Sequence, residues 1–244
     1  MLTGKVLNLA KLDIKSYFIF LLSYFRFMKS KVSQLLISES IGKVSLLTLK
    51  PKETKSVIVL AHGAGAGMTH PFMENLASQL GDLSIATVRY NFPYMEKQSK
   101  RPDVPAIAEK TVGAVLENTQ EVFPATPIFL GGKSFGGRMS SQFVSKQKPS
   151  GVKGIVFYGF PLHAPGKPDI PRADHLKSVN IPMLFLQGTR DALASLPLME
   201  KVCQGLPSAT LVKFEGADHS FKIKKADALN DLVFHTVEWM KKLY

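Results

Sequence analysis

The segment "PIFLGGKSFGGRMS", residues 127–140, contains a serine that allows two kinds of chemistry. The letters GKS at 132–134 could end a phosphate-binding loop of the G-x-x-x-x-G-K-[ST] type, whereas GKSFG at 132–136 matches the G-x-S-x-G pattern around a nucleophilic serine. The phosphate loop needs a glycine at residue 127, where the chain has Pro127, which has no N–H to offer a phosphate. A buried strand before the motif and a helix after it are what a nucleophile needs. The sequence therefore favours a nucleophile at Ser134.

A serine becomes a strong nucleophile only with a base and an orienting acid, which follow a turn of this kind in the order serine, acid, histidine. Two histidines follow a suitable acid, and His235 belongs to the polar side of an expected helix. We therefore predict His219, in the loop "FEGADHSF", as the base. Asp191 follows the strand "IPMLFLQG" and is the predicted acid, with a helix N-cap as its alternative role. Asp218 is less suitable, because adjacent side chains in an extended loop point apart.

Acyl transfer also needs N–H donors for the oxyanion that forms during the reaction. The N–H of Phe135, next to the nucleophile, is the first candidate. The second is the N–H of Ala64, or that of Gly65, in the glycine-rich turn "HGAGAG" after the strand "SVIVLA". Dinucleotide binding is disfavoured at this turn, because the glycine spacing is G-x-G-x-G and no acidic residue ends the next strand.

Short apolar runs alternate with helical patterns along the chain, and no linker or repeat divides it. Continuous apolar runs indicate strands covered on both faces, so we predict an α/β domain with a mainly parallel sheet and helices on both faces. The expected strands are residues 44–49, 56–61, 84–90, 127–132, 152–159, 181–188 and 209–214. The expected helices are residues 71–80, 104–122, 135–146, 193–205 and 225–242. We assign residues 41–244 to this domain.

The net charge of +12 raises the question of a nucleic-acid partner. Residues 1–31 hold six basic residues and one acidic residue, so they account for +5 of this charge. The rest shows no zinc-ligand spacing and no aromatic RNA-binding signature, which favours a solvated basic surface over a nucleic-acid site. The single cysteine, Cys203, allows no internal disulfide and fits a reducing compartment, so we expect a cytoplasmic protein.

Residues 1–40 stand apart as an N-terminal extension. Their apolar run at 17–25 is shorter than the roughly 20 residues that a membrane span requires, and Arg26 follows it at once. No A-x-A-like cleavage site follows, which disfavours a secretory signal. Three interpretations stand: a disordered or mis-assigned stretch upstream of a true start near Met28, then interfacial contact with a membrane through residues 1–31, and last a secretory signal.

Six ordered motifs carry a family resemblance: "LAHGAGAGMTHPFM", "VRYNFPYME", "LGGKSFGGRMSS", "YGFPLHAPGKP", "FLQGTRDAL" and "FEGADHSF". From about Ser56 onward the chain resembles the α/β-hydrolase superfamily, in particular a small lidless branch similar to dienelactone-hydrolase-like proteins and to the testis-expressed and NSL-complex-subunit hydrolase-like family. The resemblance implies an α/β-hydrolase fold without a large lid. It also implies Ser134, Asp191 and His219 as the triad and the Ala64 loop as the oxyanion site.

The expected activity is hydrolysis of a carboxylic ester, thioester or amide of small size through an acyl-enzyme, with no cofactor or metal. The alternative is a catalytically silent interaction module with the same fold. Further candidates for substrate contact are Gly65, Tyr90, Asn91 and His163, for which packing or solvated-loop roles stand as alternatives.

Overall fold

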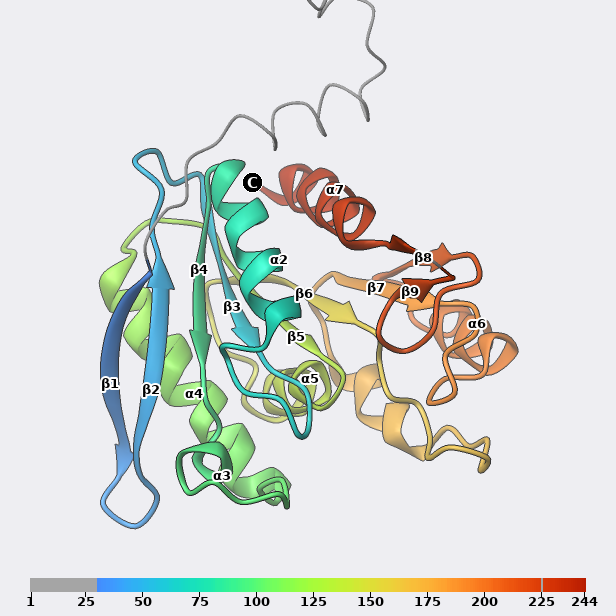
Figure 1. The fold of residues 1–244 in the computed structure, drawn as a ribbon, viewed down its shortest axis with the longest axis horizontal. Helices are drawn as coiled ribbons and strands as arrows, with labels where there is room; N and C mark the ends of the chain where they lie inside the picture. Colours follow the sequence, from blue (N-terminus) through green and yellow to red (C-terminus); the bar gives the residue numbers. More distant parts are fainter. Residues whose placement is uncertain (1–29, 225) are drawn as a thin grey trace, which may run out of the picture.

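A computed structural model describes residues 30–224 and 226–244 of the chain. Within these residues the main sheet has eight strands in the order β1-β2-β4-β3-β5-β6-β7-β8 (Figure 1). The pairs β1–β2 and β2–β4 are antiparallel, and the others are parallel. The strands are β1 (Lys31–Ser38), β2 (Gly42–Leu49), β3 (Ser56–Ala61), β4 (Ile85–Tyr90), β5 (Ile128–Lys133), β6 (Val152–Tyr158), β7 (Met183–Gly188) and β8 (Ala209–Phe214). The predicted mainly parallel α/β sheet is confirmed.

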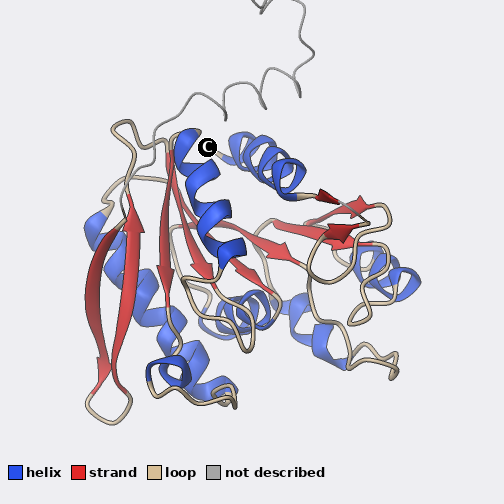
Figure 2. Ribbon diagram, viewed as in Figure 1, coloured by secondary structure: helices blue, strands red, loops and turns tan. Residues whose placement is uncertain are grey.

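Helices cover both faces of the sheet, as the sequence predicts (Figure 2). On one face lie α2 (Pro71–Asp82) and α7 (Leu229–Met240). On the other lie α4 (Pro105–Val122), α5 (Phe135–Gln147), α6 (Leu196–Gln204) and the 3₁₀ helix η2 (Pro171–Ser178). The remaining elements are short: α3 (Pro93–Glu96), the 3₁₀ helix η3 (Lys241–Leu243), and the pair of strands β9 (Lys222–Ile223) and β10 (Ala226–Asp227).

The central strands alternate between the two cores, which explains their unbroken apolar sequences. In β3, Ile58 packs into the core under α2 and α7, whereas its neighbours Val57 and Val59 pack into the core under α4 and α5. Successive side chains of a strand point to opposite faces, so a strand that is covered on both sides needs apolar residues at every position. All six residues of β3 are buried.

Strand β1 falls within residues 1–40, for which the sequence predicts an N-terminal extension and no strand. It pairs antiparallel with β2 from Lys31 opposite Thr48 to Ser38 opposite Gly42, so residues 31–38 belong to the sheet. The apolar run at 17–25, on which the interpretation of membrane contact rests, lies outside the described residues. Among the residues described, no helix is both long enough and apolar enough to cross a bilayer.

The turn from β5 into α5 depends on glycines that let three backbone segments approach closely. A Cβ atom at Gly132 would overlap the backbone of Gly137, and one at Gly136 would lie 2.5 Å from the carbonyl oxygen of Ala61 in β3. Ser134, between these glycines, has φ 50° and ψ −114°, a conformation that is strained for a residue with a side chain. The strand–turn–helix that the sequence predicts around Ser134 is present.

Gly132→Ala is expected to lower the free energy of unfolding by about 2 kcal/mol or more. The new Cβ would overlap backbone atoms, which cannot move away as the end of a flexible side chain can. The matched control is Gly205→Ala, where the nearest atom to a Cβ is 3.5 Å away and the φ of −81° suits alanine. Urea unfolding of the three proteins measures the difference. Equal stabilities for the two variants would contradict this account of the turn.

Candidate active site

A cavity of about 580 Å³ opens at the edge of the sheet where the parallel strands β3 and β5 end. Ser134 lines this cavity, and so does His219, although 85 positions separate them along the chain. The carboxyl ends of parallel strands are where α/β sheets place their sites. The other lining residues are Gly63, Ala64, Ala66, His70, Pro71, Phe72, Met73, Asn75, Lys133, Leu193, Ser220, Phe221, Lys222 and Leu229.

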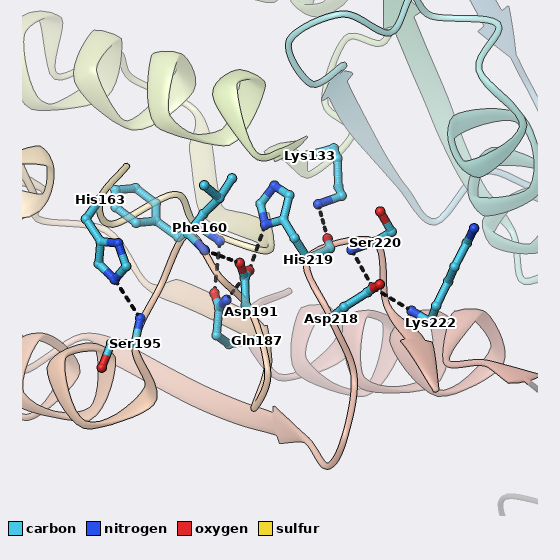
Figure 3. A network of polar contacts seen from close by, with 11 residues as sticks. Lys133, Phe160, His163, Gln187, Asp191, Ser195, Asp218, His219, Ser220 and Lys222 are labelled. Atoms are coloured by element: carbon cyan, nitrogen blue, oxygen red, sulfur yellow. Dashed lines mark hydrogen bonds and ion pairs between the residues drawn. The ribbon is translucent and has the colours of Figure 1, made fainter. Parts of the chain in front are cut away.

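His219 and Asp191 form a close pair beside the cavity (Figure 3). The Nδ1 atom of the His219 ring lies 2.7 Å from Oδ2 of Asp191. The Asp191 side chain is fully buried, whereas 24% of the His219 side chain is exposed. A neutral imidazole that donates from Nδ1 to a carboxylate has its other nitrogen, Nε2, free to accept a proton. The ring is thus oriented as a general base requires.

Two further donors fix the Asp191 carboxylate. Gln187, in β7, donates from Nε2 to the Asp191 oxygen that also meets His219, at 2.6 Å, and its own Oε1 accepts the N–H of Phe160 at 3.0 Å. The other oxygen of Asp191 accepts the N–H of Leu193 at 2.8 Å. With three donors around it, the carboxylate is locked in one orientation. No motif identifies Gln187 in the sequence, although a polar residue in the buried run "MLFLQG" is a visible signal.

Two backbone N–H groups are candidates for binding an oxyanion, one next to Ser134 in the chain and one in the cavity wall. Phe135 begins α5, where the first helical bond runs from Arg138 N to Ser134 O, so the N–H of Phe135 has no partner in its helix. Ala64 is exposed and lines the cavity. In the described part of the chain, neither of these N–H groups has a hydrogen-bond acceptor.

A family model for an alpha/beta hydrolase domain matches residues 54–237. The chain belongs to the alpha/beta hydrolases. The matched region holds Ser134, Asp191, His219 and both N–H candidates.

Solved structures of other alpha/beta hydrolases share the fold at low sequence identity. A structure described as an alpha-beta serine hydrolase homologue from Coxiella burnetii matches with a TM-score of 0.69 and 22% identity, over 87% of this chain and 100% of that one. A dienelactone hydrolase from Anabaena variabilis gives a TM-score of 0.71 and 20% identity, over 89% and 99%. A serine hydrolase without lid from Xanthomonas campestris gives 0.68 and 21%, over 88% and 97%. These likenesses establish the fold of this alpha/beta hydrolase.

The loop that carries Ala64 is anchored by side chains at the end of β4. Asn91 accepts the N–H of Met68 at its Oδ1, at 2.9 Å, and Arg89 donates from Nη1 to the carbonyl of Met68, at 2.8 Å. The backbone N–H and the backbone carbonyl of Met68 are therefore both hydrogen-bonded to side chains at the end of β4. Asn91, a predicted candidate for substrate contact, holds the loop of this hydrolase and does not line the cavity.

The other candidates for substrate contact are also not among the residues that line the cavity. Tyr90 is fully buried in the core. His163 is buried, accepts the N–H of Ser195 at Nε2 and donates from Nδ1 to the carbonyl of Ala164. Gly65 is exposed in the loop, but it is not one of the lining residues. The walls are instead formed in part by Phe72 of α2 and by Ser220 and Phe221 after β8, which the sequence does not single out for substrate contact. Within residues 30–224 and 226–244, no cluster of three His, Cys, Asp or Glu residues could hold a metal ion.

His62, directly after β3, forms a hydrogen bond with the segment that follows β4. Its Nδ1 donates to the carbonyl of Gly63 at 2.8 Å, and its Nε2 accepts the N–H of Phe92 at 3.1 Å. An Nε2 that accepts a hydrogen bond carries no proton, so the ring is neutral. Burial lowers the pKa of His62 to about 4.

Stability should therefore fall as the pH is lowered from 6.5 towards 4. In this window the unfolded chain binds a proton at His62 that the folded chain does not bind, which lowers the free energy of unfolding by about 3 kcal/mol in total. Urea unfolding near both ends of the window, with the wild type and His62→Gln, checks this: the decrease should be smaller in the variant. His175, whose pKa burial also lowers to about 4, is the same in both proteins. The same decrease in both proteins would contradict the prediction.

Proposed function

We propose that this alpha/beta hydrolase is a serine hydrolase that cleaves a carboxylic ester, thioester or amide through an acyl-enzyme. The observation that carries the proposal is the pairing of His219 with the buried carboxylate of Asp191 at 2.7 Å, in a cavity whose wall also contains Ser134. The strained backbone of Ser134 at the start of α5 supports the proposal, because it is typical of a nucleophile exposed at a strand-to-helix turn.

In the proposed reaction His219 acts first as base and then as acid. Nε2 of His219 takes the hydroxyl proton of Ser134 while Oγ attacks the carbonyl carbon, and Asp191 stabilises the imidazolium that forms. The N–H groups of Phe135 and Ala64 bind the oxyanion. The imidazolium then protonates the leaving oxygen, sulfur or nitrogen as its bond to carbon breaks. A water molecule, deprotonated by the same histidine, attacks the acyl-enzyme and releases the acid and Ser134.

The cavity suits a small acyl substrate. Its volume of about 580 Å³ lies within the range of small-molecule sites, and its apolar walls include Phe72, Phe221 and Leu229. The segment 159–180, between β6 and β7, contributes no lining residue. Within this segment, η2 packs against α5 through the buried side chains of Ala173 and Leu176.

Hydrolysis assays over three bond types test the proposal. The substrates are p-nitrophenyl esters of increasing acyl length, thioesters of N-acetylcysteamine and p-nitroanilides of the same acids. We expect turnover of the shorter esters or thioesters, with a decline as the acyl chain outgrows the cavity. If the folded protein turned over none of them, the proposal would fail and the silent interaction module would be favoured.

A further inference from the structure

The cavity wall around Ser134 is cationic. Its lining residues include two lysines, Lys133 and Lys222. None of the described residues that line it is an aspartate or a glutamate. A concave site of one charge sign attracts ligands of the opposite sign.

Lys133 lies beside the candidate base His219. It directly precedes Ser134, and its Nζ donates to the backbone carbonyl of His219 at 2.5 Å (Figure 3). The ammonium also lies over the Phe221 ring, 5.4 Å from its centre. A Cβ built at Gly159 would lie 3.1 Å from Nζ of Lys133 and 3.4 Å from Nδ1 of His219, so the glycine leaves room for both groups.

The ammonium of Lys133 can donate more hydrogen bonds than the one that it forms with His219. An ammonium has three N–H groups, and the bond to the His219 carbonyl uses one. In the described part of the structure, no carboxylate forms an ion pair with Lys133. Burial lowers the pKa of Lys133 to about 8, against the opposing charges of Asp191 and Asp218, so the group is still largely protonated at neutral pH. A desolvated cation without an ion pair is stabilised strongly by a bound anion.

We propose that Lys133 binds an anionic group of the substrate, so that the enzyme prefers esters or thioesters that carry a carboxylate a few bonds from the carbonyl under attack. This inference rests on the proposed function and names its substrate class. Lys222, exposed at the cavity wall, adds to the attraction of such substrates. The bond from Lys133 to the His219 carbonyl points to a second effect, positioning of the base, which would affect charged and neutral substrates alike.

Two matched pairs of substrates separate these effects. The first pair, the p-nitrophenyl half-ester of glutarate and p-nitrophenyl pentanoate, differs in charge on the acyl side. The second, 4-acetoxybenzoate and 4-acetoxybenzamide, differs in charge on the alcohol side. The ratio of kcat/KM within a pair is compared between proteins, so that the intrinsic reactivity of each ester cancels.

In Lys133→Met, we expect the preference for the charged member of at least one pair to fall about tenfold or more, because a charge-assisted hydrogen bond is lost. Lys133→Arg, which keeps the charge, should retain most of the preference. The control is Lys110→Met, which removes the same charge from an exposed position of α4 outside the cavity and should leave the ratio unchanged. An equal loss on both members of each pair, or no change in either ratio, would overturn the inference.

Competition on the wild type provides an independent check if Lys133→Met does not fold. Glutarate should inhibit hydrolysis of p-nitrophenyl pentanoate competitively and lose potency as the pH rises above about 8, where Lys133 loses its charge. Glutaramide should inhibit much less. Equal inhibition by the two compounds would overturn the inference while leaving the serine hydrolase intact, whereas failure of the proposed function would appear as no hydrolysis of any ester.

Discussion

Ser134→Ala is expected to lower kcat for the best ester found by at least about 10⁴-fold, with little change in thermal stability. Without Oγ no acyl-enzyme can form, and only the oxyanion donors and substrate binding remain to accelerate the reaction. In the described structure Oγ of Ser134 makes no hydrogen bond, and alanine keeps the Cβ, so folding loses nothing with the hydroxyl. Steady-state kinetics should therefore show a large loss of activity, while thermal unfolding should show almost no loss of stability.

The control for this variant is Ser150→Ala, at an exposed position before β6 and outside the cavity. Its kinetics should match those of the wild type. Retention of more than a few per cent of kcat in Ser134→Ala would contradict a covalent role for this serine.

Asp191→Asn is expected to lower kcat by about 10³- to 10⁴-fold. The carboxylate accepts hydrogen bonds from His219, Gln187 and Leu193. An amide has one oxygen and one NH₂ group, so in either orientation the NH₂ group faces a donor. If it faces His219, the ring accepts from it at Nδ1 and carries its proton on Nε2, which can then no longer act as base. If it faces Leu193 instead, a buried N–H loses its acceptor, at a cost of about 1–3 kcal/mol in stability.

Asp218→Asn is the matched control, because Asp218 was the competing candidate for the acid. Its Oδ1 accepts the N–H groups of Ser220 and Lys222, at 2.8 and 3.0 Å, and an asparagine oxygen can accept both. We expect less than about a tenfold change in kcat. A larger loss in Asp218→Asn than in Asp191→Asn would reverse the assignment of the acid.

The central strands and most helices could be predicted from the sequence, because both faces of the sheet demand apolar residues and leave unbroken runs. The antiparallel edge strand β1 could not be predicted in this way. In β1, Val32 and Leu36 are 67% and 53% exposed, so the strand carries no clear pattern of burial. Helix α6 begins at Leu196, after the predicted Leu193, whose N–H is held by the Asp191 carboxylate in the preceding turn. A strand pair as short as β9–β10 leaves no periodicity to detect.

The candidate triad could be proposed from the G-x-S-x-G motif and the chain order, because a nucleophile at one strand end limits where its base and acid can follow. Residues that act through tertiary contacts could not be found this way. Lys133 was visible in the motif, but its bond to the His219 carbonyl depends on how the loop after β8 folds back over β5. The roles of Asn91 and His163 likewise depend on which backbone N–H groups lie near their side chains. The spacing of residues in the sequence does not reveal these neighbours.

The most direct test is mass spectrometry of the folded protein after treatment with a fluorophosphonate, which modifies serines activated by a neighbouring base. The account predicts one adduct, mapped to Ser134, that is absent in Ser134→Ala and forms much more slowly in His219→Ala. No adduct on the folded wild type, or an adduct on a different residue, would contradict it.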